Sequence, residues 1–251
     1  MLQKILVWFI GFSPFTKRWF WKKWYNVFAD RAKNSDFKFM NYGFDENGFF
    51  PDLKTEDKQE RYPIQLYHHV ASQTDLSGKV VLEVGSGRGG GASYVSRYLR
   101  PSSVLGVDIS ESAVELCNSI HAVDNLSFTV GDSEDLPFDA GSFDVVLNVE
   151  SSHCYGSVDQ FLKEVNRVLK PGGHFLWCDL RPPGNINDTY SRFEKAGFNI
   201  VQKRDITKNI LSALSKMTAS RKKAIQERVP GLFQKVFESY AGVEGSKVYD
   251  S

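Results

Sequence analysis

The chain has 251 residues with a net charge of +1, and its composition is ordinary for one globular domain with small additions at its ends. The near-zero net charge gives no field that would recruit nucleic acid. Cys117, Cys154 and Cys178 have no CxxC spacing, which indicates reduced thiols in a cytoplasmic protein and excludes a disulfide framework or a zinc site.

The N-terminal segment has an unusual composition. Residues 1–28 contain ten aromatic and five basic residues and no acidic one, and the apolar run in residues 5–12 is far shorter than the ~20 residues of a transmembrane helix. We expect residues 1–61 to form an aromatic and basic cap with a lid over the domain. The alternative is that residues 1–28 contact an anionic membrane surface, which would make the protein peripheral on a membrane.

The rest of the chain alternates between helical and strand patterns, which predicts an α/β fold with a doubly wound, mainly parallel sheet. In such a sheet the ligand lies at the carboxyl ends of the strands. We expect strands at 79–84, 103–110, 126–132, 141–151, 174–180 and 199–206, and helices at 62–77, 91–100, 111–123, 158–173, 189–198 and within 206–241.

A glycine-rich turn follows the first predicted strand. Gly85, Gly87 and Gly90 fit GxGxxG, and Asp108 ends the next strand, a pattern that a dinucleotide-binding dehydrogenase would also show. The turn lacks the Lys-Ser/Thr pair of a nucleotide-hydrolysing P-loop. Glu83, inside the first strand, favours a cationic ligand instead, and Asp132 follows the third strand, where it could accept a hydrogen bond from adenine.

Four ordered motifs between residues 79 and 180, "VLEVGSGRGG", "GVDIS", "GDSEDLPF" and "FDVVLNVES…LKPGG", resemble those of class I S-adenosylmethionine-dependent methyltransferases, which have a Rossmann-like fold. The resemblance implies that Asp108 binds the ribose hydroxyls and that Asp132 and Ser133 lie near adenine. A turn or N-cap role is the alternative for both aspartates. The cofactor-binding residues implied in this way are Glu83, Gly85, Ser86, Gly87, Asp108, Ile109, Asp132, Ser133, Asn148 and Tyr42.

A more specific resemblance extends from about residue 62 to the C-terminus. "RGGGASY", "LNVESSHCY", "LKPGGHFLWCDLRP" and "GVEGSKVY" are similar to the phthiotriol/phenolphthiotriol dimycocerosates methyltransferases, which implies methylation of a lipid or polyketide hydroxyl. "FMNYGF" resembles an element that many small-molecule methyltransferases fold over the cofactor, which makes Tyr42 part of a lid. The relatives continue past "VYDS" with a strand-like segment, so we expect a sheet without the last antiparallel strand.

Methyl transfer to an alcohol requires an aligned acceptor and removal of its proton. His153 follows the fourth predicted strand and is our candidate base, with a structural histidine as the alternative. Glu150 could orient His153 or pair with the cofactor's charge, and Tyr155 could bond to the acceptor. Asp179 faces the same edge, but one acidic residue without partners does not make a metal site, so we expect no metal.

We therefore expect a cofactor-binding core at 62–205 and a helical cap at 206–251. The predicted function is O-methylation of a lipid-like or polyketide hydroxyl with S-adenosylmethionine. Methylation of carbon or nitrogen in another apolar molecule is one alternative, and a shortened, non-catalytic S-adenosylmethionine-binding protein is another. The sequence leaves the oligomeric state and the identity of the apolar acceptor open.

Overall fold

The structure is a computed structural model that describes residues 38–228, 234, 242–246 and 249. The predicted aromatic and basic segment at 1–28 lies outside these residues. The described residues divide into two compact units, one formed by residues 38–39 and 70–202 and the other by residues 40–69 and the described residues from 203 onward. Among the described residues, no helix is both long and apolar enough to cross a membrane.

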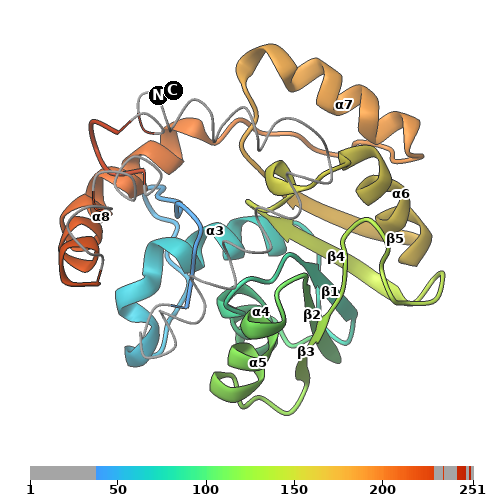
Figure 1. Ribbon diagram of the computed structural model, residues 1–251, viewed down its shortest axis with the longest axis horizontal. Helices are drawn as coiled ribbons and strands as arrows, with labels where there is room; N and C mark the ends of the chain where they lie inside the picture. The colour runs from blue at the N-terminus through green and yellow to red at the C-terminus, as the bar shows by residue number, and fades with distance from the viewer. Residues whose placement is uncertain (1–37, 229–233, 235–241, 247–248, 250–251) are drawn as a thin grey trace. The chain divides into compact units, whose positions relative to one another are not determined.

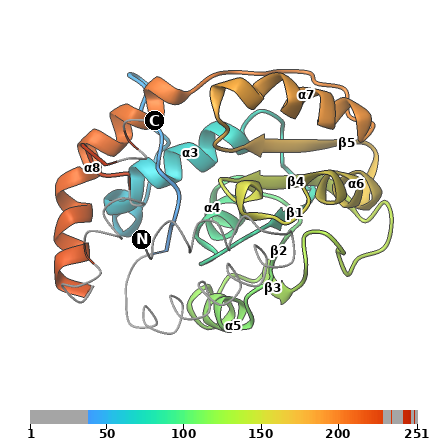
Figure 2. The ribbon, with the colours of Figure 1, turned by 45° about the horizontal axis from the view of Figure 1, so that its top comes forward.

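The first unit contains a five-stranded sheet (Figure 1). Its strands are β1 (Val80–Val84), β2 (Ser103–Asp108), β3 (Leu126–Val130), β4 (Phe143–Val149) and β5 (Leu169–Cys178). The strand order is β3-β2-β1-β4-β5 and every pair is parallel. Figure 2 shows β4 and β5 pointing the same way. The predicted parallel α/β sheet is confirmed, and the carboxyl ends of its strands meet at one edge.

Helices follow the strands as a parallel sheet requires, because each crossover must return the chain to the start of the next strand. They are α4 (Gly90–Tyr98), α5 (Glu111–Ile120), α6 (Val158–Val168) and α7 (Ile186–Lys195). In Figure 1, α4 and α5 lie beside β2 and β3, and α6 and α7 lie toward β5. The Oγ atoms of Ser110 and Ser157 accept hydrogen bonds from the N–H groups of Ala113 and Gln160, which caps α5 and α6.

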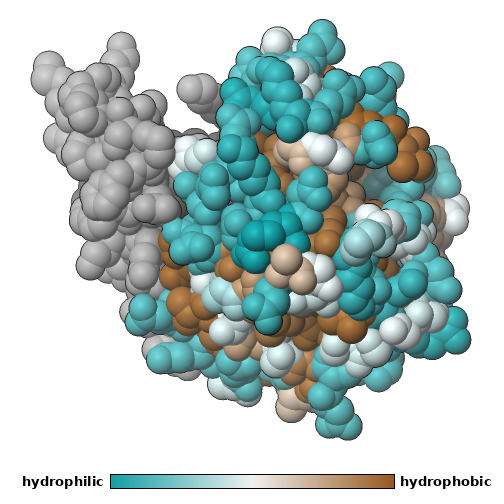
Figure 3. Space-filling model, turned by 90° about the vertical axis from the view of Figure 1, so that its right-hand side faces the viewer, coloured by the Kyte–Doolittle hydropathy of each residue, from teal (hydrophilic) through white to brown (hydrophobic). Residues whose placement is uncertain are grey.

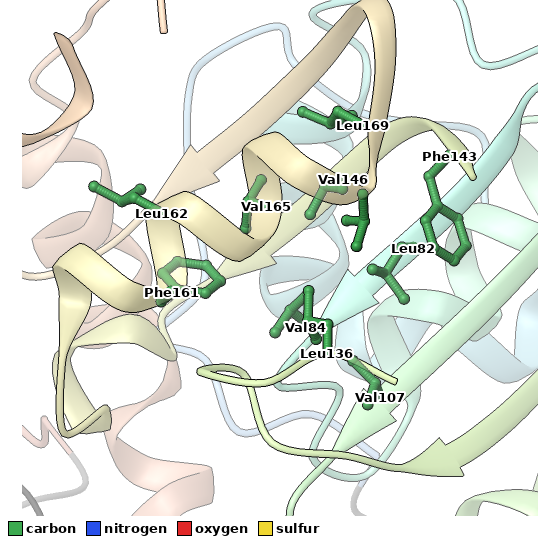
Figure 4. Close-up of a cluster of buried hydrophobic side chains, with 11 residues drawn as sticks. Leu82, Val84, Val107, Leu136, Phe143, Val146, Phe161, Leu162, Val165 and Leu169 are labelled. Atoms are coloured by element: carbon green, nitrogen blue, oxygen red, sulfur yellow. The ribbon is translucent and has the colours of Figure 1, made fainter. Parts of the chain in front are cut away.

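Both faces of the central strand β1 are buried. Leu82 and Val84 point toward α6, where they join Val146 and Phe161 in one hydrophobic cluster (Figure 4). Val81 and Glu83 alternate to the opposite face and are only 0% and 1% exposed. The face of the molecule drawn in Figure 3 shows hydrophilic residues with hydrophobic ones between them. Because β1 is covered on both sides, its sequence "VVLEV" is apolar at every position except Glu83.

Three predicted elements differ clearly from the structure. The helix predicted at 62–77 ends at Ala71. The helix predicted at 158–173 ends at Val168, and Leu169–Gly173 already belong to β5. Pro171 has no N–H to donate, which a strand at the edge of a sheet tolerates and a helix interior does not. The strand predicted at 199–206 is wrong, since these residues form neither strand nor helix up to α8. Val201 there is 90% exposed, so the alternating pattern has no buried face.

The second unit is mainly helical. It contains the 3-10 helix η1 (Thr55–Glu60), most of α3 (Arg61–Ala71), and α8 (Thr207–Arg228). Asp45 connects the segment before η1 to α8, because its carboxylate accepts hydrogen bonds from Ser212 (2.6 Å) and Lys216 (2.7 Å). Phe44 is fully buried and stacks on His69 with ring centroids 4.3 Å apart. The helical pattern predicted after residue 206 is confirmed for 207–228.

Candidate functional site

The glycine turn lies between β1 and α4, where the sequence predicts it. Gly85, Gly87 and Gly89 have φ angles of +75°, +54° and +75°, which side chains rarely tolerate. A Cβ atom on Gly85 would lie 1.9 Å from Ser151 Oγ and 2.6 Å from the Tyr155 hydroxyl. Gly85 is therefore required both by its backbone conformation and by the close approach of the segment that follows β4.

Asp108 ends β2 beside this turn. Its Oδ2 accepts a hydrogen bond from the Gly87 N–H (2.8 Å), and its Oδ1 accepts one from the Ser110 N–H (3.0 Å). Burial raises the pKa of Asp108, although these backbone bonds and one from Ile109 act in the opposite direction. A buried carboxylate is stabilised by further donors, and a pair of ribose hydroxyls would supply them.

Polar side chains are also buried at the carboxyl ends of β1 and β4. Glu83 is 1% exposed and lies between Gly106 of β2 and Leu147 of β4 in the strand register. Asn148 is fully buried, and its Nδ2 donates to the Val84 carbonyl (2.8 Å) and to the Tyr155 hydroxyl (2.9 Å).

Two acceptors at this edge are left for a ligand. Within the described part of the chain, Asn148 Oδ1 and Ser86 Oγ are buried without a hydrogen-bond partner. Unsatisfied buried polar atoms are costly unless something binds them. Together with the carboxylates of Glu83 and Asp108, they fit a ligand that carries positive charge and several donors, as S-adenosylmethionine does.

Asp132, Ser133 and Tyr42 were also predicted to bind the cofactor. Asp132 follows β3, and its Oδ1 accepts a hydrogen bond from the Glu134 N–H (3.0 Å), so it has the turn geometry that we weighed as the alternative role. Asp132 and Ser133 are both partly buried. Tyr42 belongs to the second unit, where the Arg221 guanidinium lies 5.8 Å from the centre of its ring. The lid role of Tyr42 stays a prediction.

His153 lies in the 3-10 helix η2 (Ser152–Cys154), directly after β4, and its ring bonds to a carboxylate that the sequence analysis did not assign to it. His153 Nδ1 donates to Asp179 Oδ1 (2.6 Å), and the His153 N–H donates to Asp179 Oδ2 (2.8 Å). The Asp179 side chain is fully buried, whereas the His153 side chain is 35% exposed. Asp179, rather than Glu150, therefore orients His153.

The charge of Asp179 controls the protonation of His153. Burial alone would lower the pKa of His153, but the Asp179 hydrogen bond and the neighbouring Cys154 side chain outweigh burial and raise this pKa to about 10. In turn, burial would raise the pKa of Asp179, but His153 and Arg181 hold it below its ordinary value. The pair is a carboxylate and a strongly basic imidazole.

The other groups around Asp179 hold it rigidly. Ser152 Oγ donates to Asp179 Oδ2 (2.5 Å) and accepts hydrogen bonds from Arg181 Nη2 (2.8 Å) and Trp177 Nε1 (3.0 Å). Arg181 Nη1 also lies 3.0 Å from Asp179 Oδ2. No group of three or more His, Cys, Asp or Glu side chains in the described ranges is arranged to hold a metal ion.

Glu150 and Tyr155 also lie after β4, and the roles predicted for them stay predictions. Glu150 has a φ of +48°, an uncommon value for a residue with a side chain, and its N–H donates to the Cys178 carbonyl (2.7 Å). The Tyr155 hydroxyl bonds to Ser151 Oγ (2.8 Å) and to Asn148, and burial raises its pKa well above the ordinary value. Both residues lie in the segment that follows β4, which carries His153 and approaches Gly85.

Comparison with known proteins identifies the family of this chain. Residues 82–177 match the family model of a methyltransferase domain. The phthiotriol/phenolphthiotriol dimycocerosates methyltransferase of Mycobacterium tuberculosis is 37% identical over 94% of this chain and 88% of its own length. The fatty-acid O-methyltransferase of Mycolicibacterium smegmatis is 39% identical over 86% of this chain and 79% of its own length.

Solved structures show the same fold. A phosphoethanolamine N-methyltransferase of Haemonchus contortus, solved with S-adenosylhomocysteine, has a TM-score of 0.59 at 18% identity and covers 70% of this chain and 47% of its own. The cyclase SpnF has a TM-score of 0.65 at 20% identity and covers 86% of this chain and 88% of its own. The chain is thus an S-adenosylmethionine-dependent methyltransferase, and it belongs to the family of the phthiotriol/phenolphthiotriol dimycocerosates methyltransferases.

Proposed function

We propose that this enzyme methylates a hydroxyl oxygen of a lipid-like acceptor, with His153 as the general base. The relatives named above support a lipid-related acceptor. The observation that carries the choice of oxygen chemistry is the partly exposed imidazole of His153 on the buried carboxylate of Asp179. In its neutral form, a group with this arrangement is a strong proton acceptor and is held in one orientation.

The segment that carries His153 also contacts the proposed cofactor site through Tyr155. Tyr155, two residues further on, bonds through its hydroxyl to Ser151 and Asn148 against Gly85. We therefore assign Tyr155 a positioning role. Glu83, Ser86, Asp108 and Asn148 would hold S-adenosylmethionine, which supplies an activated methyl group on a positively charged sulfur when bound.

The task of the protein in the reaction is to place and deprotonate the acceptor. Asp179 holds Nδ1 of His153, which leaves Nε2 as the ring nitrogen that exchanges a proton with the acceptor. Nε2 would take the hydroxyl proton of the acceptor when the acceptor receives the methyl group that S-adenosylmethionine would supply. The charge of Asp179 stabilises the imidazolium that results.

The test replaces His153 and measures transfer of labelled methyl groups to long-chain alcohols. We expect His153→Gln to lose about 10²–10⁴-fold in kcat, the usual contribution of a general base, with an unchanged Kd for S-adenosylmethionine. His174→Gln is the matched control, because His174 is exposed on β5. Unchanged turnover in His153→Gln would remove His153 from the mechanism.

A fatty-acid carboxylate is a second candidate acceptor. The raised pKa keeps His153 protonated near neutral pH, and an imidazolium attracts a carboxylate, which needs no base. One relative is named a fatty-acid O-methyltransferase. If the acceptor is a carboxylate, His153→Gln should raise KM for the fatty acid while kcat changes little.

A further inference from the structure

Two side chains at the end of α5, those of Cys117 and His121, bond to backbone carbonyls of the glycine turn. Cys117 lies in α5, and His121, four residues further on, is the first residue after this helix. The two side chains therefore face the same way. Cys117 Sγ donates to the Gly87 carbonyl (3.3 Å), and His121 Nε2 lies 2.8 Å from the Arg88 carbonyl. We call Cys117 and His121 the α5 pair.

The surroundings of His121 determine its charge and which of its ring nitrogens carries a hydrogen. The residue is 7% exposed, and its ring packs against Phe128 with centroids 5.7 Å apart. Burial lowers the pKa of His121, and the charges of Lys38, Arg97 and Arg88 act in the same direction, although the hydrogen bond to the Arg88 carbonyl opposes them. The ring is therefore neutral near pH 7, and since a carbonyl only accepts, the Nε2 atom that faces Arg88 carries the hydrogen.

The α5 pair bonds to two consecutive residues of the turn, Gly87 and Arg88. The N–H of Gly87 donates to Asp108 and its carbonyl accepts from Cys117, so both backbone polar groups of Gly87 bond to side chains. His121 takes the next carbonyl, that of Arg88. A Cβ on Gly89 would lie 2.6 Å from the Phe128 ring and 2.8 Å from the His121 ring. The turn thus rests on a wall made by these two rings.

This support matters because the turn has little internal support beyond one backbone hydrogen bond, from the Gly89 N–H to the Ser86 carbonyl (2.8 Å). Gly89 is the N-cap of α4, adopts a left-handed conformation and provides no side-chain cap. Glycines also lose more conformational freedom on ordering than other residues. A turn that is fixed before the ligand arrives avoids that entropy cost during binding, so groups that fix it increase affinity.

We propose that the α5 pair positions the glycine turn for S-adenosylmethionine, and that cofactor affinity depends on the hydrogen bonds from Cys117 and His121 to the turn carbonyls. This inference rests on the proposed cofactor site at the turn. Neither side chain is expected to touch the reacting atoms. Both therefore act through the backbone of Gly87 and Arg88.

Three variants test the proposal. His121→Phe keeps a ring against Phe128 but loses the donor, and Cys117→Ala loses the thiol donor. Cys117→Ser keeps a donor of similar size. We expect His121→Phe and Cys117→Ala to raise the Kd for S-adenosylmethionine about five- to tenfold in calorimetry, the equivalent of one ordinary hydrogen bond, and Cys117→Ser to stay within about twofold of the parent. His174→Gln is the control for loss of a histidine.

A second measurement uses the protein without cofactor. The amide protons of Gly87 and Gly89 should exchange faster with solvent in His121→Phe and Cys117→Ala than in the parent and in Cys117→Ser. If His121→Phe does not fold, the Cys117 variants decide alone. Parent-like Kd and exchange in the donor-loss variants, with Asp108→Asn still weakening cofactor binding, would overturn the α5 pair but not the site. Unchanged binding in Asp108→Asn would overturn both.

Discussion

Asp179→Asn is the most informative single substitution in the site. Asparagine has nearly the same shape as aspartate, so it can still accept hydrogen bonds from Ser152 and from the His153 N–H. It removes the negative charge that faces His153 and Arg181, and it puts an amide donor in place of Oδ1, which accepts hydrogen bonds from His153 Nδ1 and the Leu180 N–H. The variant therefore separates the charge of Asp179 from its place in the packing.

The magnitude follows from the geometry of the pair. The two side chains are 2.6 Å apart, the carboxylate is fully buried and the imidazole is 35% exposed. An opposite charge at such a distance raises the pKa of a histidine by about 1–3 units, and solvent at the exposed side of the ring favours the lower part of that range. We expect the pKa of His153 to fall by about 1–2 units from its value of about 10.

The same change alters stability in a pH-dependent way. The raised pKa of His153 stabilises the fold below the unfolded-state value of 6.5, and this contribution is lost as pH rises toward about 10. The lowered pKa of Asp179 stabilises the fold above 3.8 and is lost as pH falls through its folded value. Asp179→Asn should therefore lower the free energy of unfolding most between about pH 4 and pH 6.5, by about 2 kcal/mol, a cost reduced by the exposure of His153.

Proton NMR measures the pKa directly. The chain has five histidines, so its ring signals can be followed separately, and the His153→Gln variant identifies the signal of His153. Urea unfolding at about pH 5.5 and pH 9 supplies the stability difference. A parent His153 that titrates at or below 6.5, or a pKa that is the same in Asp179→Asn, would refute the view that Asp179 makes His153 basic.

Four further outcomes are expected. The logarithm of kcat/KM for an alcohol should rise by about one unit per pH unit between about pH 7 and pH 9, because the neutral fraction of His153 grows, whereas a fatty-acid acceptor should show no such rise. Asp108→Asn should weaken S-adenosylmethionine binding about 100-fold in calorimetry, since two charge-assisted bonds to ribose are lost; a change below twofold would contradict the assignment. Gly85→Ala should cost about 2–4 kcal/mol in urea unfolding through the clash with Ser151, and Gly78→Ala, with open space around it, only about 1 kcal/mol. Liposome flotation of the full chain and of a chain without residues 1–28 tests the membrane prediction, and equal flotation would end it.

Local pattern was enough to predict most of the core. Each run from β1 to β4 forms the predicted strand, and β1 and β4 are almost continuously apolar because both of their faces are buried. The failures lie where a strand depends on a partner. The residues at 199–206 have the composition of a strand but no neighbour to bond with among the described residues. The first half of β5 carries Pro171 and glycines, which locally indicate a helix end.

The proposed cofactor groups follow directly from the sequence, because they lie within or next to a strand end and a turn whose conformation requires glycine. Gly85, Gly87 and Asp108 could be predicted in this way. Glu83 was predicted from a carboxylate in an otherwise apolar strand, which has no explanation in packing alone.

The partner of His153 was decided only by tertiary structure. Asp179 is 26 residues further along the chain, and nothing in the local pattern pairs it with His153 rather than with a metal or with solvent. The two meet because β4 and β5 are parallel and Val149 pairs with Cys178, so the residues that follow both strands lie together. The hydrogen bonds of Cys117 and His121 to the glycine turn arise similarly, since they need the angle at which α5 packs. Residue types and their spacing determined the fold and the cofactor turn, whereas strand register and helix packing decided which side chains act together, because those contacts join residues far apart in the chain.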